Sequence, residues 1–197
     1  MIKNTYLILC WLSLTVLAPT AKATSIEKLE FDAMASTSEV IFQGEVVSVK
    51  ARWNEASTDI HTYVTFRVDD TIKGSISTQQ LELRFAGGKV GDDNVVYQGL
   101  VYPNVGEVGI YFVETLEKNL INPLTGWSQG HFKVVGSQVM TNEDKPLMAL
   151  TRSSKVVPGE FSHGTASGVH VGSDGDTGMS AANFKDQIKA AMNRAPR

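Results

Sequence analysis

Apolar and polar residues alternate over most of the stretch from Val40 to Val135, and this pattern constrains the fold most. Residues 39–53 are predicted to form a long strand whose alternation changes phase at Val46-Val47. Because side chains in a strand repeat every second residue, the phase can change only through an extra residue. The sequence therefore predicts a β-bulge there, with Gly44 easing the bend. A bulged, coiled first strand favours a small closed barrel over a flat sheet.

Further alternating segments follow, separated by turn-forming residues such as Gly74 and the pair Gly87-Gly88. No segment alternates strand with helix in the pattern that builds a parallel sheet. The predicted fold class is therefore mainly β, a small antiparallel barrel with an N-terminal and a C-terminal helix. The predicted strands after the first cover residues 61–72, 81–85, 108–112, 131–136 and 138–141.

The N-terminal helix is predicted over residues 24–37. Thr24 and Glu27 have the T-x-x-E spacing of a capping box, and apolar residues recur after them at helical intervals. We expect this helix to lay one apolar stripe on the core. Together with the strands it forms the predicted barrel domain, residues 24–150.

The C-terminal part of the chain is predicted to be a linker followed by a helix. Residues 151–179 are rich in glycine and serine, which is typical of a flexible linker. In the final segment, 180–197, Ser180 caps a helix over residues 181–193. Its apolar stripe, which we expect to dock on the barrel, consists of Phe184, Ile188 and Met192.

Residues 1–23 have the three parts of a cleavable secretory signal peptide. Lys3 supplies a positive charge, residues 6–18 are apolar, and Ala21-Lys22-Ala23 has the form of a cleavage site. The apolar run is shorter than the ~20 residues that span a bilayer. We therefore expect export to the periplasm or the outside of the cell, without stable membrane insertion after cleavage.

Cysteine content and charge narrow the functions of the expected mature chain. The single cysteine of the full sequence, Cys10, lies within the predicted signal peptide, so we expect no disulfide and no cysteine-based site after cleavage. Residues 1–23 contain Lys3 and Lys22 and no acidic residue, so their removal changes the net charge from −3 to −5. A chain of this charge has no basic field to attract nucleic acid, and we expect no nucleic-acid partner.

No motif marks a catalytic site or a metal site. The sequence lacks the G-x-S-x-G elbow of serine hydrolases, and Gly87-Gly88 does not lead into a phosphate-binding helix. His61 and His131 each precede a strand, without further ligands at metal-binding spacing. We therefore predict no catalytic residue, no metal ligand and no cofactor. Calcium binding within residues 163–178 stays open, because Ser173–Gly178 places oxygen atoms at alternate positions but lacks the bidentate glutamate.

The binding candidates are aromatic and polar side chains on predicted outward faces or loops. Exposed aromatic residues anchor protein partners or sugars, although more often they cover a core beneath a long loop. The candidates are Trp53, Tyr63, Trp127, Gln129 and His131.

Two parts of the chain resemble the netrin-like module of the tissue inhibitors of metalloproteinases. The first runs from Ser38-Glu39-Val40-Ile41 through Gly44-Glu45-Val46 and Tyr63–Val68 to Lys73-Gly74. The second, Gly126–Val134, is similar to a segment near the end of the barrel in uncharacterised exported bacterial proteins with the same pattern. The resemblance implies an OB-like barrel flanked by helices.

The mechanism by which that family inhibits proteases does not apply to this chain. Those inhibitors place a disulfide-bonded N-terminal cysteine on the zinc of the protease, whereas the expected mature chain begins near Thr24 and has no cysteine. The resemblance therefore implies the scaffold alone, whose loops and rim can bind proteins, sugars or other ligands.

The function expected from the sequence is that of an exported, non-enzymatic binding module whose partner is a protein, an extracellular protease being one such partner. Two alternatives remain open. One is a secreted hydrolase or metal-dependent enzyme that uses His61 or His131 with loop carboxylates. The other is a cell-surface or matrix component whose segment 151–179 tethers the last helix to a partner.

Overall fold

The computed structural model describes residues 26–152 and 164–194. The signal peptide predicted at residues 1–23, the predicted cap Thr24 and His163 lie outside these ranges. Within these ranges, no helix has both the length and the apolar character needed to cross a bilayer.

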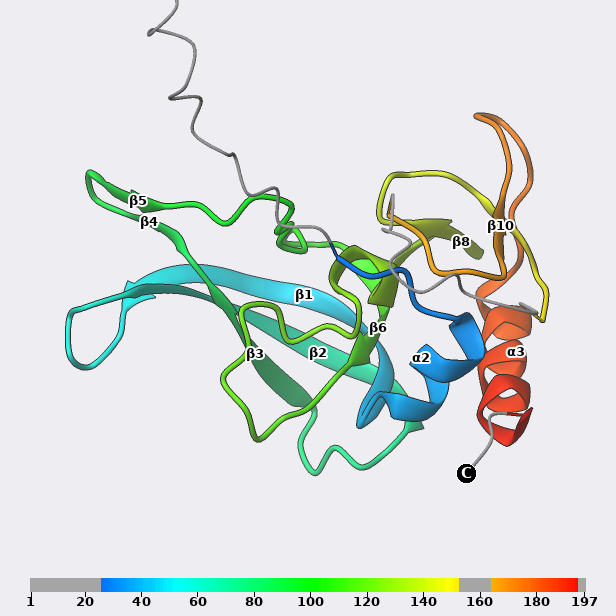
Figure 1. Ribbon diagram of the computed structural model, residues 1–197, viewed down its shortest axis with the longest axis horizontal. Coiled ribbons are helices and arrows are strands. Elements are labelled where there is room, and N and C mark those ends of the chain that lie inside the picture. Colours follow the sequence, from blue (N-terminus) through cyan, green and yellow to red (C-terminus); the bar gives the residue numbers. More distant parts are fainter. Residues whose placement is uncertain (1–25, 153–163, 195–197) are drawn as a thin grey trace, which may run out of the picture.

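The described residues form a mainly β structure with two α-helices, as the sequence predicts (Figure 1). The helices are α2 (Phe31–Thr37) and α3 (Ala181–Arg194), with a 3₁₀ turn, η1 (Trp127–Gly130). The strands are β1 (Val40–Trp53), β2 (Ile60–Lys73), β3 (Gln80–Ala86), β4 (Gly88–Val90), β5 (Asp93–Val95), β6 (Val108–Val113), β7 (His131–Val135), β8 (Gln138–Thr141), β9 (Leu147–Leu150) and β10 (Val169–Val171).

The main sheet has six strands in the order β3-β2-β1-β6-β7-β8, with antiparallel pairing throughout. β1 is shared between the hairpin partner β2 and the distant strand β6. β3 and β8 end the order and do not pair with each other in the described residues, so the predicted closed barrel is not found. Each edge strand contacts another segment instead. Ala86 at the end of β3 donates its amide to the carbonyl of Ile121 in a loop, and Gln138 of β8 forms a bridge with Ser180.

The β-bulge predicted at Val46-Val47 is confirmed. Val46 pairs with Phe66, and Ser48 pairs with Thr65, so Val47 has no partner on β2. The extra residue lets the apolar side chains continue on the other phase of the alternation, and it bends the strand.

The central strands β1 and β6 separate two apolar cores. One core contains Ile41, Ile110 and Phe112 on the face of the sheet that the helices cover. The other contains Phe42 and Tyr111, on the opposite face of the same strands. Both faces of β6 are therefore buried, with Ile110 and Phe112 in one core and Tyr111 in the other.

Helix α2 begins at Phe31 rather than at Thr24. The residues before it run extended, since Glu30 forms a bridge with Ser167 and the amide of Leu29 donates to the side chain of Gln129 at 2.9 Å. These tertiary contacts override the local helical pattern in the described residues 26–30. The apolar stripe that follows does pack on the core, as expected.

The described part of the predicted linker packs on the rest of the molecule. β10 pairs with β9, and the preceding Ala166 is only 1% exposed. Residues 153–163 lie outside the described ranges, and the stretch 164–178 is neither irregular throughout nor detached. The apolar residues Val169 and Leu150, which face each other across this hairpin, account for the pairing.

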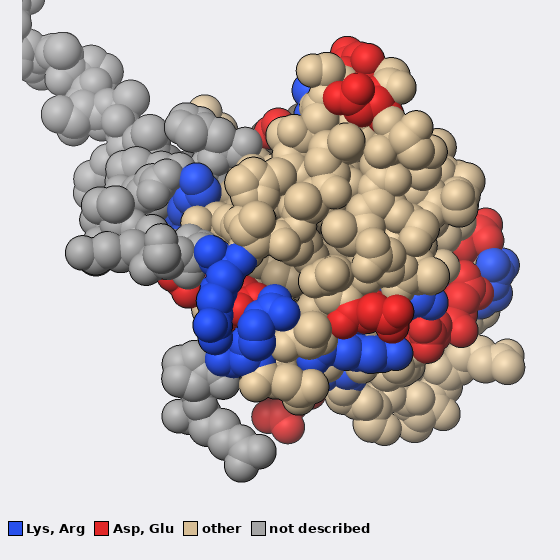
Figure 2. Space-filling view, turned by 90° about the vertical axis from the view of Figure 1, so that its right-hand side faces the viewer, with Lys and Arg blue, Asp and Glu red and all other residues tan. Residues whose placement is uncertain are grey.

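The C-terminal helix docks as predicted. Ser180 Oγ accepts the amide of Asn183, while Phe184 and Ile188 enter the core that contains Phe31. Figure 1 places α3 beside α2 at one end of the sheet, opposite the far end of the long β1–β2 hairpin. On the face seen in Figure 2, basic and acidic side chains adjoin one another. An ion pair between Arg194 of α3 and Asp32 of α2 joins the two helices at 2.9 Å.

Candidate functional site

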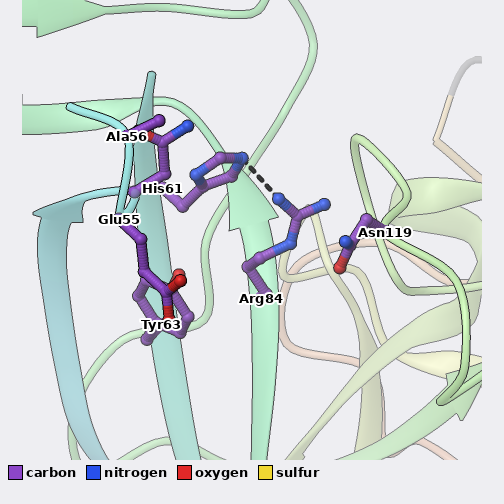
Figure 3. Close-up of a pocket in the computed structure, with 7 residues that line it drawn as sticks. Glu55, Ala56, His61, Tyr63, Arg84 and Asn119 are labelled. Carbon is purple, nitrogen blue, oxygen red and sulfur yellow. Dashed lines mark hydrogen bonds between the residues drawn. The ribbon is translucent and has the colours of Figure 1, made fainter. Parts of the chain in front are cut away.

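An open pocket of about 420 Å³ lies where the β1–β2 loop meets the start of β2 and the outer strand β3 (Figure 3). β2 and β3 supply side chains to its floor, the β1–β2 loop supplies one wall, and the loop after β6 supplies the opposite wall. The lining residues are Asn54, Glu55, Ala56, His61, Tyr63, Arg84 and Asn119.

The loop wall is held in place by its own polar side chains. Asn54 Oδ1 accepts the backbone amides of Thr58 and Asp59 at 2.8 and 3.2 Å, which fixes a compact turn. Asp59 Oδ1 accepts the amide of Ile60 at 2.9 Å, so this carboxylate is held at the start of β2. The exposed Glu55 is left at the rim of the pocket.

His61 and Arg84 form the most unusual contact in the pocket. Arg84 Nη1 is hydrogen-bonded to His61 Nε2, and Figure 3 shows the guanidinium between His61 and Asn119. A guanidinium only donates, so Nε2 must be the acceptor and the proton of the neutral ring must sit on Nδ1. Burial lowers the pKa of His61, and the charge of Arg84 lowers it further against the opposing effect of Asp59. The ring is therefore neutral near pH 7.

Two buried donors in this pocket have no hydrogen-bond partner in the described part of the chain. They are His61 Nδ1 and Arg84 Nε. His61 as a whole is only 7% exposed, so water reaches its ring poorly. Buried polar atoms without partners are uncommon in folded proteins, and leaving one unpaired costs about 1–3 kcal/mol.

Tyr63 forms the middle of the pocket floor. It lies directly opposite Arg84 in the β2–β3 pairing, and the guanidinium of Arg52 stacks 3.5 Å from its ring centre. Arg52 also holds Glu82 at 3.1 Å. Trp53 lies at the far end of β1, is 39% exposed and does not line the pocket. Of the candidates from the sequence, Tyr63 alone belongs to this site.

Gln129 is buried and structural. Its side chain, 1% exposed, accepts the amide of Leu29 and donates to the carbonyl oxygens of Glu27 and Gly126 at 3.0 and 3.1 Å. These bonds tie the extended segment before α2 to η1. A residue with its amide group so occupied is not available to an external ligand.

His131 is also enclosed, with 2% of its surface exposed. Its Nε2 is hydrogen-bonded to Glu107 Oε1, which also accepts the hydroxyl of Tyr111 at 3.2 Å. Burial acts to raise the pKa of Glu107, but the hydrogen bond and charge of His131, with further bonds from Asn104 and Tyr111, outweigh it and lower the pKa. Burial, followed by the charge of Glu107, raises the pKa of Tyr111.

Trp127 starts η1 in the left-handed conformation, with a φ of 60°, directly after Gly126 at 64°. Such a φ is rare for a bulky residue. Its side chain is half-buried and does not line the pocket, so the structure does not bring Trp127 together with Tyr63.

The carboxylates of the calcium-like segment have internal partners. Asp174 pairs with Lys145 at 2.8 Å, and Asp176 Oδ2 accepts the amide of Ser173 at 2.7 Å. Among residues 26–152 and 164–194, no group of three or more His, Cys, Asp or Glu side chains is placed to hold a metal ion.

The sequence reasoning missed Arg84 and Asn119. Arg84 is an outward residue of an alternating strand, the pattern of an ordinary solvent-facing side chain. Its partial burial results from the loop after β6, whose Leu120 carbonyl lies 3.4 Å from Arg84 Nη2. No local signal predicts that long-range contact. A comparison with models of known protein families, with curated proteins and with solved structures finds no match.

Proposed function

We propose that this chain is an exported, non-enzymatic binding module that holds a protein partner at the pocket formed by the β1–β2 loop, β2 and β3. The observation that carries the proposal is the site itself, an open pocket lined by His61 and Arg84, each of which has a buried donor without a partner in the described part of the chain. A partner that supplies acceptors there removes the cost of leaving those donors unpaired.

We also propose that the sheet is an OB-like, netrin-like scaffold. The run β3-β2-β1-β6-β7 supports this, because it places the first strand between its hairpin partner and a later strand, as in a partly open Greek-key barrel. OB-folds bind their ligands on the second and third strands and on the loop between the first two strands. The pocket occupies the corresponding part of this sheet.

The state of the histidines supports binding rather than catalysis. A neutral imidazole has one basic lone pair. In His61 this lone pair is on Nε2, where it accepts the hydrogen bond from Arg84. His131 is enclosed and bonded to Glu107. Neither ring presents a free basic nitrogen to a substrate at the surface, which general base catalysis requires. Export places the partner outside the cytoplasm, and the netrin-like resemblance suggests a secreted protease as that partner.

Photo-crosslinking tests the proposal. The full chain, with p-benzoylphenylalanine replacing Glu55 at the rim of the pocket, is expressed in its source cells and illuminated. We expect a discrete adduct that mass spectrometry identifies as an exported protein. The matched control carries the same group at Met148, an exposed residue of β9. No adduct at position 55, or the same adducts at both positions, contradicts the proposal.

A further inference from the structure

We propose that the pocket binds a carboxylate of the partner protein, with the guanidinium of Arg84 and the Nδ1–H of His61 as donors. This inference rests on the proposed function and adds the chemical group that the pocket recognises. It follows from the hydrogen-bonding capacity of the two side chains and from the charges around them.

Arg84 lacks the counter-ion that other arginines of the fold possess. Arg52, Arg67 and Arg194 each hold a carboxylate within 3.2 Å. Arg84 has no carboxylate within 4.0 Å in the described part of the chain, and its contacts are to His61 and to the carbonyl of Leu120. Its Nε has no hydrogen-bond partner among residues 26–152 and 164–194. A half-buried guanidinium with unused donors matches the two oxygens of a carboxylate.

His61 adds a second donor, its Nδ1–H, which has no acceptor among the described residues. Its Nε2 accepts from Arg84, so its proton sits on Nδ1, and that atom is buried and unpaired. The side chain as a whole is 9% exposed. In the adjoining loop, the side-chain oxygens Asn54 Oδ1 and Asp59 Oδ1 already accept backbone amides of their own turn, and Asp59 Oδ2 lies 3.6 Å from Nε2 rather than at Nδ1.

The surrounding charges disfavour a doubly charged acceptor. Glu55 lies at the rim, and Asp59 Oδ2 is 3.6 Å from His61 Nε2. These two carboxylates repel a doubly charged phosphate more strongly than a carboxylate. A protein offers carboxylates on Asp and Glu side chains and at its C-terminus. The pocket, at about 420 Å³, has room for one such group.

Titration of short peptides into the full chain tests the inference, with side-chain ¹⁵N resonances of arginine and histidine observed by NMR. The probes are acetyl-Gly-Glu-Gly-amide for a side-chain carboxylate and acetyl-Gly-Gly-Gly with a free C-terminus for a main-chain one. Acetyl-Gly-Gln-Gly-amide and inorganic phosphate are the controls. We expect saturable shifts of Arg84 Nε and His61 Nδ1 with at least one carboxylate probe, and the tighter of the two identifies the source.

The variants separate recognition from general charge effects. Arg84→Gln is expected to weaken binding about tenfold or more, because it removes a charge-assisted donor pair. Arg84→Lys keeps the charge but loses the planar fork, and it is expected to weaken binding as well. The matched control Arg67→Gln, on the same strand as His61 but paired with Glu45 and Asp69, leaves binding unchanged. Equal binding of the glutamine peptide, or undiminished binding by both Arg84 variants, overturns the inference.

The crosslinking experiment distinguishes this inference from the proposed function. If the adduct at position 55 forms equally well with Arg84→Gln and with Arg84→Lys, the carboxylate inference is wrong and the proposed function stands. If no adduct forms while carboxylate peptides bind in the Arg84-dependent manner, the proposed function is wrong and the pocket is still a carboxylate site. Urea unfolding of each variant shows that it is folded before either result is used.

Discussion

Glu107, just before β6, and His131, the first residue of β7, form a hydrogen-bonded pair in the interior. Their side chains are 10% and 2% exposed, and the carboxylate also accepts the hydroxyl of Tyr111. A carboxylate so enclosed depends on its donors, because little water is available to replace one that is lost.

Substitution His131→Leu is therefore expected to destabilise the fold strongly. Removing the donor leaves a buried carboxylate short of a hydrogen-bond partner, which costs at least about 1–3 kcal/mol. The measurement is the free energy of unfolding in urea. The double variant Glu107→Met, His131→Leu is expected to be more stable than His131→Leu alone, because the stranded carboxylate is gone. A single variant as stable as the unchanged chain contradicts the structural role of the pair.

His61 is expected to make the protein less stable in mild acid. Its pKa is lowered in the folded state, so below about pH 6.5, the ordinary value, the unfolded chain binds a proton that the folded chain resists. The contribution of His61 is therefore complete above about pH 6.5 and is lost as the pH falls through the lower, folded pKa.

Urea midpoints between pH 7 and pH 5 measure this effect. His61→Gln is expected to flatten the decline in stability over that window, because glutamine does not titrate. His170→Gln, an exposed histidine on β10, serves as the matched control and keeps the decline. If His61→Gln retains the full decline, the neutral state assigned to the buried ring is wrong.

The strands and the bulge could be predicted because they depend on local alternation. The change of phase at Val46-Val47 is visible in the sequence and appears as an unpaired Val47 in the sheet. Closure of the sheet was predicted wrongly, because alternation determines which face is buried and not which strands meet at the edges. The pairing of Gln138 with Ser180 is a contact between segments far apart in the sequence, which periodicity does not encode.

Of the residues that line the pocket, the sequence analysis named Tyr63 as a binding candidate and His61 in the enzyme alternative. The chemistry of the pocket depends on Arg84, whose place in an alternating strand predicts a solvent-exposed side chain. In the structure the loop that contains Leu120 contacts Arg84. Gln129 and His131 were selected as polar side chains on predicted outward faces or loops, but a polar side chain can also be buried where it satisfies polar groups of the interior. Burial is the property that separates the two cases, and burial depends on the tertiary fold.

Gln129 offers a test of how the segment before α2 is held. Its amide group accepts from Leu29 and donates to Glu27 and Gly126. Gln129→Glu keeps the acceptor and loses the donors, while Gln129→Leu loses both. Each is expected to cost about 1–3 kcal/mol, because buried polar groups are left unpaired. Hydrogen exchange separates them: the Leu29 amide stays protected in the Glu variant and exchanges faster in the Leu variant. Equal exchange in both contradicts the assigned bond.

Gly109 is expected to be indispensable for the position of Tyr111. Gly109 pairs with Gly44 across β6 and β1, and the Tyr111 ring lies over it, on the way to Glu107. A Cβ at position 109 falls 2.6 Å from Tyr111 Cζ and 2.8 Å from the carbonyl oxygen of Phe132. Gly109→Ala therefore forces the ring away from Glu107, and such overpacking costs about 1–3 kcal/mol.

Urea unfolding of Gly109→Ala, Tyr111→Leu and the double variant measures the coupling between the two positions. Leucine is smaller than tyrosine and leaves room for the added methyl group, so the double variant is expected to be less destabilised than the sum of the single changes. The residual cost reports the clash with the backbone at Phe132, which the smaller side chain does not relieve. Strictly additive effects contradict the contact between Gly109 and the Tyr111 ring, and with it the reason for a glycine at this place in a buried strand.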